Sequence, residues 1–247
     1  MTDYHLTQGN TAKLYCLNFI DQLASERSGV QTILDLGCGT GLNFVALLKK
    51  HPCIRYIGVE PSRHACDAAR NALQGLNVDI RNEFAYDVTV PPVDVVVSFS
   101  VLEHVYRRQK YLECAKRNLA PDGVFLINYD AGHFVMPGSL RPGIDRWLNF
   151  LSPIKAALGY EKSYQSFVRE NDFKSLVQAV GLKIIDEKMF NTDLKTTYRF
   201  VPSEYREQFM VRWLALELDL NAMGITYADS MAHVFRTRNF ILMHRPD

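Results

Sequence analysis

The feature that most constrains the fold is an alternation of short apolar runs with helix-length amphipathic segments along the first two-thirds of the chain. This alternation is typical of βαβ units, in which parallel strands alternate with the helices that cover them. The runs are rich in Val and Ile, as expected for strands buried on both faces. The expected strands are Thr32–Leu36, Arg55–Val59, Asn77–Arg81, Val93–Ser98 and Val124–Asn128. The helices expected between them are Leu42–Lys50, Ser62–Gln74 and Arg108–Leu119.

The regular alternation of strands and helices ends after the fifth expected strand. Residues 131–165 contain several Pro and Gly, and a second long insertion, 191–237, follows a sixth strand expected at Leu182–Phe190. The last strand is expected at Asn239–His244. Within the second insertion, helical spacing predicts an amphipathic helix over Glu204–Asn221, with Phe209, Trp213, Leu216 and Leu220 on its apolar face. That face either packs on the body of the protein or forms a dimer interface.

A glycine-rich loop follows the first expected strand, in the run Asp35-Leu36-Gly37-Cys38-Gly39-Thr40-Gly41. Glycine is needed where a strand turns sharply into a helix and the backbone approaches a ligand, because a Cβ atom would clash. Gly41 stands four residues after the first glycine, whereas the dinucleotide-binding fingerprint would place its last glycine at Leu42. Asp35 would repel a pyrophosphate near the helix N-terminus and would suit a cationic ligand.

A second acid, Glu60, closes the second expected strand, about twenty residues beyond the loop. A carboxylate at that place can accept hydrogen bonds from both hydroxyl groups of a ribose. S-Adenosylmethionine carries a ribose, an ammonium and a sulfonium, but no phosphate. Asp35, the glycine spacing and Glu60 together therefore predict S-adenosylmethionine as cofactor, with S-adenosylhomocysteine as its product.

These motifs resemble the class I S-adenosylmethionine-dependent methyltransferase family, closely over residues 30–130 and loosely over 170–190. The run from Ser98 to Val105 also looks like the family's segment after strand four, whereas Glu83-Phe84 replaces the commoner Asp-Ala after strand three. The resemblance implies a doubly wound, mostly parallel seven-stranded α/β sheet. Its strand order is 3-2-1-4-5-7-6, with an antiparallel last strand and helical insertions after strands five and six.

The resemblance also implies which residues contact the cofactor. They come from the glycine loop, the ends of strands two to four, and an N-terminal segment that closes over the cofactor in relatives. The expected set is Asp35, Gly37, Cys38, Gly39, Gly41, Glu60, Pro61, Glu83, Phe84, Ser98, Ser100, Tyr4 and Tyr15.

The acceptor is expected to bind where both insertions leave the sheet, because ligands of such sheets bind at the carboxyl ends of the strands. We expect one domain over 1–247, with residues 1–30 as an N-terminal helical lid and 131–165 and 191–237 as the substrate cover. An alcohol, phenol or ammonium acceptor must lose a proton, which favours a base with a near-neutral pKa. The candidates are His133, oriented by Asp130, and His104.

Composition limits the partners. The 28 basic and 27 acidic residues give a net charge of +1, which argues against binding to nucleic acid. The five cysteines form no C-x-x-C pair, and no residue set has metal-ligand spacing, so we expect no metal. We see no signal peptide and no membrane-length apolar run, and therefore expect a cytoplasmic protein that is a monomer or a homodimer.

Three functions agree with these patterns. The first is methyl transfer by in-line displacement to an oxygen or nitrogen of a small-molecule acceptor. The second is a methyltransferase that acts on RNA, DNA or protein, although Ser98-Phe99-Ser100 replaces the Asn/Asp-Pro-Pro-aromatic run of enzymes that methylate exocyclic base nitrogens. The third is a non-catalytic subunit that binds the cofactor.

Overall fold

The computed structural model describes residues 10–26, 29–131 and 164–245. Its seven strands form one sheet in the order β3-β2-β1-β4-β5-β7-β6, which confirms the predicted order. Strand β7 runs antiparallel to both of its neighbours, β5 and β6, whereas all other neighbouring strands in this sheet are parallel. The strands are β1 (Thr32–Leu36), β2 (Arg55–Val59), β3 (Val78–Arg81), β4 (Val93–Phe99), β5 (Leu119–Asp130), β6 (Leu182–Phe190) and β7 (Thr237–His244).

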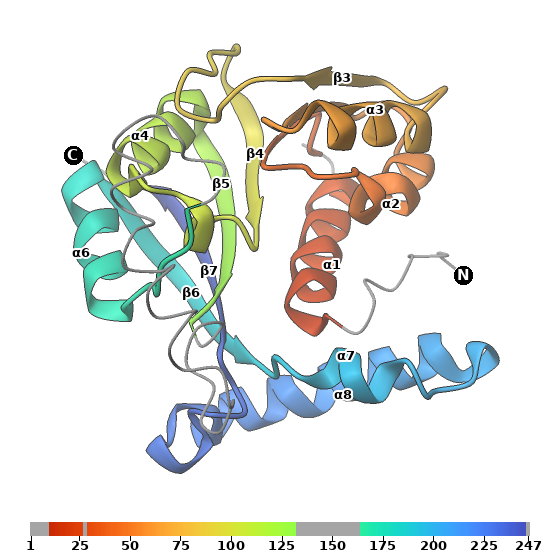
Figure 1. Cartoon of the computed structure of the whole chain (residues 1–247), viewed down its shortest axis with the longest axis vertical. Helices are drawn as coiled ribbons and strands as arrows, with labels where there is room; N and C mark the ends of the chain where they lie inside the picture. Colours follow the sequence, from red (N-terminus) through yellow and green to blue (C-terminus); the bar gives the residue numbers. More distant parts are fainter. Residues whose placement is uncertain (1–9, 27–28, 132–163, 246–247) are drawn as a thin grey trace.

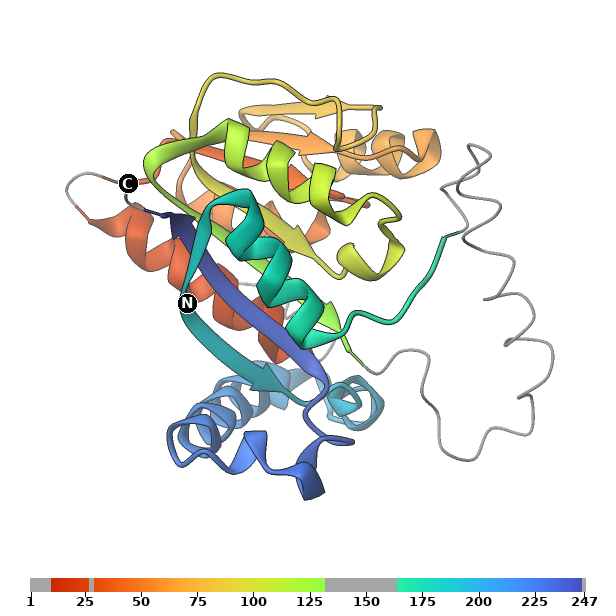
Figure 2. The same cartoon turned by 90° about the vertical axis from the view of Figure 1, so that its left-hand side faces the viewer.

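Helices cover both faces of the sheet (Figure 1). They are α1 (Thr11–Ser25), α2 (Val45–Lys50), α3 (Arg63–Ala72), α4 (Arg108–Asn118), α6 (Glu170–Val180), α7 (Leu194–Tyr198) and α8 (Arg206–Ala222). Helix α3 begins after an N-cap serine, because the Ser62 hydroxyl accepts a hydrogen bond from the Ala65 amide at 3.4 Å. In Figure 2, α6 lies in front of β7 and β6, and α1 lies behind them.

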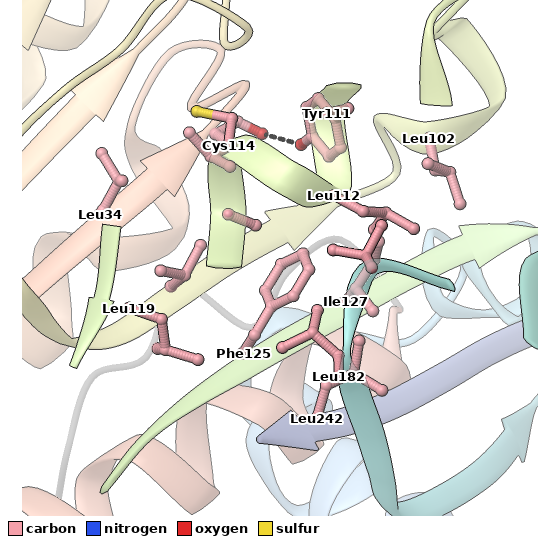
Figure 3. Packing of buried hydrophobic residues seen from close by; sticks show 14 of the residues in the cluster. Leu34, Leu102, Tyr111, Leu112, Cys114, Leu119, Phe125, Ile127, Leu182 and Leu242 are labelled. Atoms are coloured by element: carbon pink, nitrogen blue, oxygen red, sulfur yellow. Dashed lines mark hydrogen bonds between the residues drawn. The ribbon is translucent and has the colours of Figure 1, made fainter. Parts of the chain in front are cut away.

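Alternate residues of the buried strands supply two separate cores. Leu34 and Leu36 of β1 pack with Tyr111 of α4 and with Phe173 of α6, whereas Ile33 packs with α1, α2 and α3. Figure 3 shows part of the first core, where Phe125 and Ile127 of β5 lie near Leu242 of β7. Because side chains alternate along a strand, Asp35 shares the face of Ile33 and points away from the first core.

The fully buried stripe of helix α8 differs from the predicted one, although Phe209 and Trp213 of the predicted stripe are partly buried against the same cluster. The buried residues are Met210, Leu214, Glu217 and Asn221, while Leu216 of the predicted stripe is 48% exposed. Hydrogen bonds from two polar side chains of α8 to the backbone hold this stripe against the protein. The Glu217 carboxylate accepts a hydrogen bond from the Asn191 amide at 2.7 Å, and the Asn221 side chain bonds both backbone groups of Met189. The buried stripe therefore lies one residue further along the chain than the predicted one.

Helix α1 packs on the sheet through Cys16, Leu17 and Ile20, which are fully buried. The part of the expected N-terminal lid that forms α1 is thus a helix of the layer that covers the sheet. Only the start of this helix, at Asn10 and Lys13, lies beside the cavity where the ligand is expected. In the parts of the chain that the structure describes, no helix is both long enough and apolar enough to span a bilayer.

Candidate cofactor and acceptor site

The glycine loop is fastened to the end of β2. The amides of Gly37 and Cys38 both donate to the Val59 carbonyl oxygen, at 2.8 and 3.0 Å. The half-buried Glu60 then bridges two elements, since its Oε2 accepts from the Gly39 amide at 3.2 Å and its Oε1 from the Ser62 amide at 2.9 Å. Glu60 therefore sets the distance between the loop and the start of α3.

Two glycines of the loop are required for different reasons. Both have positive φ, 54° at Gly39 and 70° at Gly41. A Cβ atom added at Gly39 would meet no atom within 4 Å, because this residue borders an open cavity. A Cβ atom at Gly41 would lie 2.8 Å from Leu73 Cδ1, and Gly41 is not among the described residues that line the cavity. Gly41 is thus required by its close packing against Ala69 of α3 and Leu73 just beyond it, and its expected cofactor contact stays a prediction.

A pair of alanine variants separates these two roles. Gly41→Ala is expected to destabilise the fold by about 1–3 kcal/mol, from a disfavoured φ and a steric overlap. Gly39→Ala carries only the φ penalty of about 1–2 kcal/mol, but its methyl group enters the cavity. Thermal unfolding and cofactor titration of both variants check this. Equal cofactor affinities in the two variants would contradict the assignment.

Asp35 lies beneath the loop and is 2% exposed. The Tyr56 hydroxyl donates to its Oδ2 at 2.7 Å, and its buried Oδ1 has no hydrogen-bond partner among the described residues. Burial raises the pKa of Asp35 to about 7, against the opposing effects of Tyr56 and Lys13. Asp35 is not a lining residue of the cavity, so it acts on a ligand through its charge and through the loop above it.

A cavity of about 1140 Å³ opens at the carboxyl ends of β1, β2, β4 and β5. Pockets for one drug-sized ligand hold roughly 300–1000 Å³, so this cavity has room for a cofactor and an acceptor. Nine of the predicted site residues line it: Gly37, Cys38, Gly39, Glu60, Pro61, Phe84, Ser100, His104 and Asp130. Tyr4 and His133 lie outside the described residues.

Three other predicted contact residues have side-chain partners outside the cavity, so their contacts with the cofactor stay predictions. Ser98 is fully buried, and its hydroxyl lies 2.8 Å from the Tyr111 hydroxyl, which is also 2.8 Å from the Leu36 carbonyl oxygen. Tyr15 donates to Asp186 Oδ2 at 2.7 Å. Glu83 faces Arg81, with 3.9 Å between their charged groups. None of the three lines the cavity.

Tyr86 is a lining residue that the sequence did not single out. Its ring is stacked with that of Phe84, with 6.4 Å between centroids and 12° between planes. Phe84 is 36% exposed, so an aromatic surface faces the cavity beyond β3. Such a surface suits a flat heterocycle. In the sequence, the aromatic residues at the alternate positions 84 and 86 could have indicated this surface.

Ser100, at the end of β4, is the one non-glycine residue with positive φ in the described chain, at 58°. Its amide donates to both the backbone carbonyl and the side-chain oxygen of Asn128, at 3.0 and 3.1 Å. Asn128 is fully buried in β5 and fixes this unusual backbone. Strained residues held by their surroundings cluster at functional sites.

Glu103 and Lys13 also line the cavity, although neither was predicted from the sequence as a site residue. Glu103 is 3% exposed and its Oε2 has no hydrogen-bond partner in the described part of the chain. Burial raises the pKa of Glu103 to about 7, against hydrogen bonds from backbone amides. Burial lowers the pKa of the Lys13 ammonium, while Asp35 and Glu103 nearby raise it. The signal for Glu103 was its place in the run after β4.

The cavity fits S-adenosylmethionine on two observations of its own residues. The void beside Gly39 leaves room for a ligand to touch the loop backbone. The partnerless Oδ1 of Asp35 beneath the loop gives that position a negative charge when the group is ionised. Among the described residues, the Lys13 ammonium makes no hydrogen bond or ion pair, so it is available to a carboxylate.

Comparisons with known proteins agree with this geometry. The methyltransferase-domain family matches residues 9–187. The trans-aconitate 2-methyltransferase of Azoarcus sp. (strain BH72) is 30% identical over 139 residues, 52% of this chain and 53% of the relative. The ubiquinone biosynthesis O-methyltransferase of Caulobacter vibrioides is 28% identical over 136 residues, 49% of this chain and 54% of the relative. The chain thus spans about half the length of the curated relatives that it matches.

A solved structure shows the same fold. It is an O-methyltransferase from a polyketide synthase multienzyme of Brevibacillus brevis, in complex with S-adenosylhomocysteine. Its TM-score is 0.56 at 15% identity, over 93% of this chain and 72% of that chain. Sheet order, glycine loop and cavity define a class I methyltransferase fold. Because the family match covers well over half of the chain, the protein belongs to the class I S-adenosylmethionine-dependent methyltransferase family.

Proposed function

We propose that the protein is an active methyltransferase that moves the methyl group of S-adenosylmethionine to an oxygen or nitrogen of a small-molecule acceptor. The observation that carries this proposal is the continuous cavity that joins the glycine loop to the buried carboxyl group of Glu103. S-Adenosylmethionine, when bound, supplies an electrophilic methyl group. The chain then needs to hold the cofactor, place the acceptor and remove a proton.

The cofactor side of the cavity has a residue for each part of the ligand. The Glu60 carboxylate would accept hydrogen bonds from the ribose hydroxyls, in place of part of its present bonding to backbone amides. Phe84 and Tyr86 offer a surface for the adenine. Lys13 would pair with the methionyl carboxylate, and ionised Asp35 beneath the loop would favour the ammonium.

We assign proton removal to Glu103. A carboxylate with a pKa near neutrality is a better base than an ordinary exposed one, and Glu103 lines the cavity with one buried oxygen that has no hydrogen-bond partner among the described residues. His104 and Asp130, the predicted catalytic residues that line the same cavity, would position the acceptor beside it. The role predicted for His133 stays a proposal, for which the His133→Ala variant is the test: unchanged cofactor binding with reduced turnover.

Two features favour a small acceptor. The cavity is covered by the segment after β6, through Asn191, Thr192, Lys195 and Tyr198. Two relatives of the chain are, by name, a trans-aconitate and a ubiquinone-pathway methyltransferase. The macromolecular alternative lacks a comparable observation, since the chain has no basic surplus.

Calorimetric titration followed by a turnover assay tests the proposal. We expect S-adenosylmethionine and S-adenosylhomocysteine to bind and NAD not to bind, because a carboxylate beneath the loop repels a diphosphate. Release of S-adenosylhomocysteine in the presence of a panel of small alcohols, phenols, amines and carboxylic acids then identifies the acceptor. Preferential binding of NAD would refute the proposal. Tight cofactor binding, with turnover only on RNA or protein substrates, would favour the macromolecular alternative.

A further inference from the structure

Three basic side chains line the part of the cavity that is formed by the segment after β6. Lys195 belongs to α7, Arg199 follows its last residue, and Arg206 begins α8. Lys195 and Arg199 are four residues apart, a spacing that places side chains on one face of a helical turn. The two acids of this segment, Asp193 and Glu204, do not line the cavity. Asp193 is paired with Arg236 at 3.3 Å.

The residues that the structure describes do not neutralise these cations. Within the described residues, the side chains of Lys195 and Arg199 have no hydrogen bond or ion pair. Arg206 is held in place, because its Nε donates to the Val201 carbonyl oxygen at 2.9 Å and its guanidinium lies 5.2 Å from the centre of the Tyr198 ring. Its terminal N–H groups make no hydrogen bond in the described part of the chain, so they are free to bind a ligand.

These three cations share the cavity with a cationic cofactor. Repulsion between the positive charges makes this unfavourable unless an anion also binds there. S-Adenosylmethionine has a net positive charge, and Lys195 is already near enough to Lys13 to lower the pKa of that ammonium, although burial is the larger cause. The acids that line the cavity, Glu60, Glu103 and Asp130, come from the ends of β2 and β5 and from the segment after β4. Among the described lining residues, none supplies a negative charge from α7 itself, so an acceptor with a negative charge would complement this part of the cavity.

We propose that the acceptor is an oxyanion, a small molecule with carboxylate or phosphate groups, and that Lys195, Arg199 and Arg206 bind those groups. This inference rests on the proposed function, since it concerns the acceptor of the same reaction. Arginine suits such ligands because its planar guanidinium donates two parallel hydrogen bonds to a carboxylate or phosphate. The cations set specificity, while the chemistry takes place nearer to Glu103.

The test uses the whole chain and two probes, tricarballylate and glycerol 3-phosphate. Each is titrated calorimetrically into the protein alone and into protein saturated with S-adenosylhomocysteine. The variants are Lys195→Gln with Arg199→Gln, and, as a matched control, Arg212→Gln, an exposed α8 residue that does not line the cavity. We expect one probe to bind the wild type, and the double variant to bind it at least about tenfold more weakly. The control and the affinity for S-adenosylhomocysteine should be unchanged.

Each outcome decides between explanations. Stronger binding of tricarballylate identifies carboxylates, and stronger binding of glycerol 3-phosphate identifies phosphates. The inference is overturned when neither probe binds, or when the uncharged triamide of tricarballylate binds equally well. It is also overturned when the double variant loses affinity for S-adenosylhomocysteine instead, because the cations then serve the cofactor. Failure of S-adenosylhomocysteine to bind the wild type refutes the proposed function separately, since the titrations on protein alone still report on the cations.

Discussion

Replacement of Asp35 by Asn is expected to weaken S-adenosylmethionine binding by about 30- to 100-fold at about pH 8, and much less at about pH 5.5. The buried carboxyl group has a pKa raised to about 7, so it carries its charge mainly above neutral pH. The wild-type affinity should therefore fall as the pH falls through 7, whereas the Asp35→Asn protein should show little dependence. Calorimetric titration across this range measures both curves.

The same carboxyl group has an opposite effect on the protein without ligand. Its folded-state pKa lies above the unfolded value of about 4, so between about pH 4 and 7 the folded state binds more protons than the unfolded state. The stability contribution of this group is therefore full at low pH and is lost as the pH rises through that window. Thermal unfolding should show a shallower decline for Asp35→Asn. Asp67→Asn, an exposed change on α3, is the matched control, and parallel affinity curves for wild type and Asp35→Asn would contradict the role of Asp35.

Replacement of Glu103 by Gln is expected to reduce turnover by roughly 10²–10⁴-fold and to leave cofactor affinity nearly unchanged. Glutamine has almost the shape of glutamate but cannot accept the acceptor's proton. Because burial raises the pKa of Glu103 to about 7, the wild-type rate should rise as the pH passes through 7, and the variant should lose that rise. Initial rates of S-adenosylhomocysteine release measure both effects.

Glu113→Gln is the control for this second experiment, because Glu113 is an exposed residue of α4 that pairs only with Gln109 among the described residues. A Glu103→Gln protein with an unchanged rate would remove Glu103 as the base. The remaining candidates would then be His104 and His133, whose substitution by Ala would be the next comparison.

Much of the fold could be predicted because buried parallel strands leave a simple pattern. The Val- and Ile-rich runs predicted β1, β2 and β6 with the bounds that the structure has. The glycine loop was predictable for a similar reason, since a tight turn with positive φ excludes most side chains. Local sequence determines both features.

Other parts of the site depend on partners far away in the sequence. The neighbours of Ser98 predicted a cofactor contact, but its position is determined by Tyr111, and Tyr15 is held by Asp186. The predicted stripe of α8 missed the two buried polar residues Glu217 and Asn221, which bind the backbone around β6. Lys13 reaches the cavity only because α1 packs on the sheet. No periodicity in the sequence reports such contacts.

Because β7 runs antiparallel to β6, the segment that joins them begins and ends at the same edge of the sheet. The segment after β6 leaves the sheet at Phe190 and re-enters it at Thr237, and these two residues are paired neighbours in β6 and β7. Its length and side chains can therefore change without shifting the register of any strand. A change in this one segment would alter the wall of the cavity that it lines, while the glycine loop and the end of β2 stay the same.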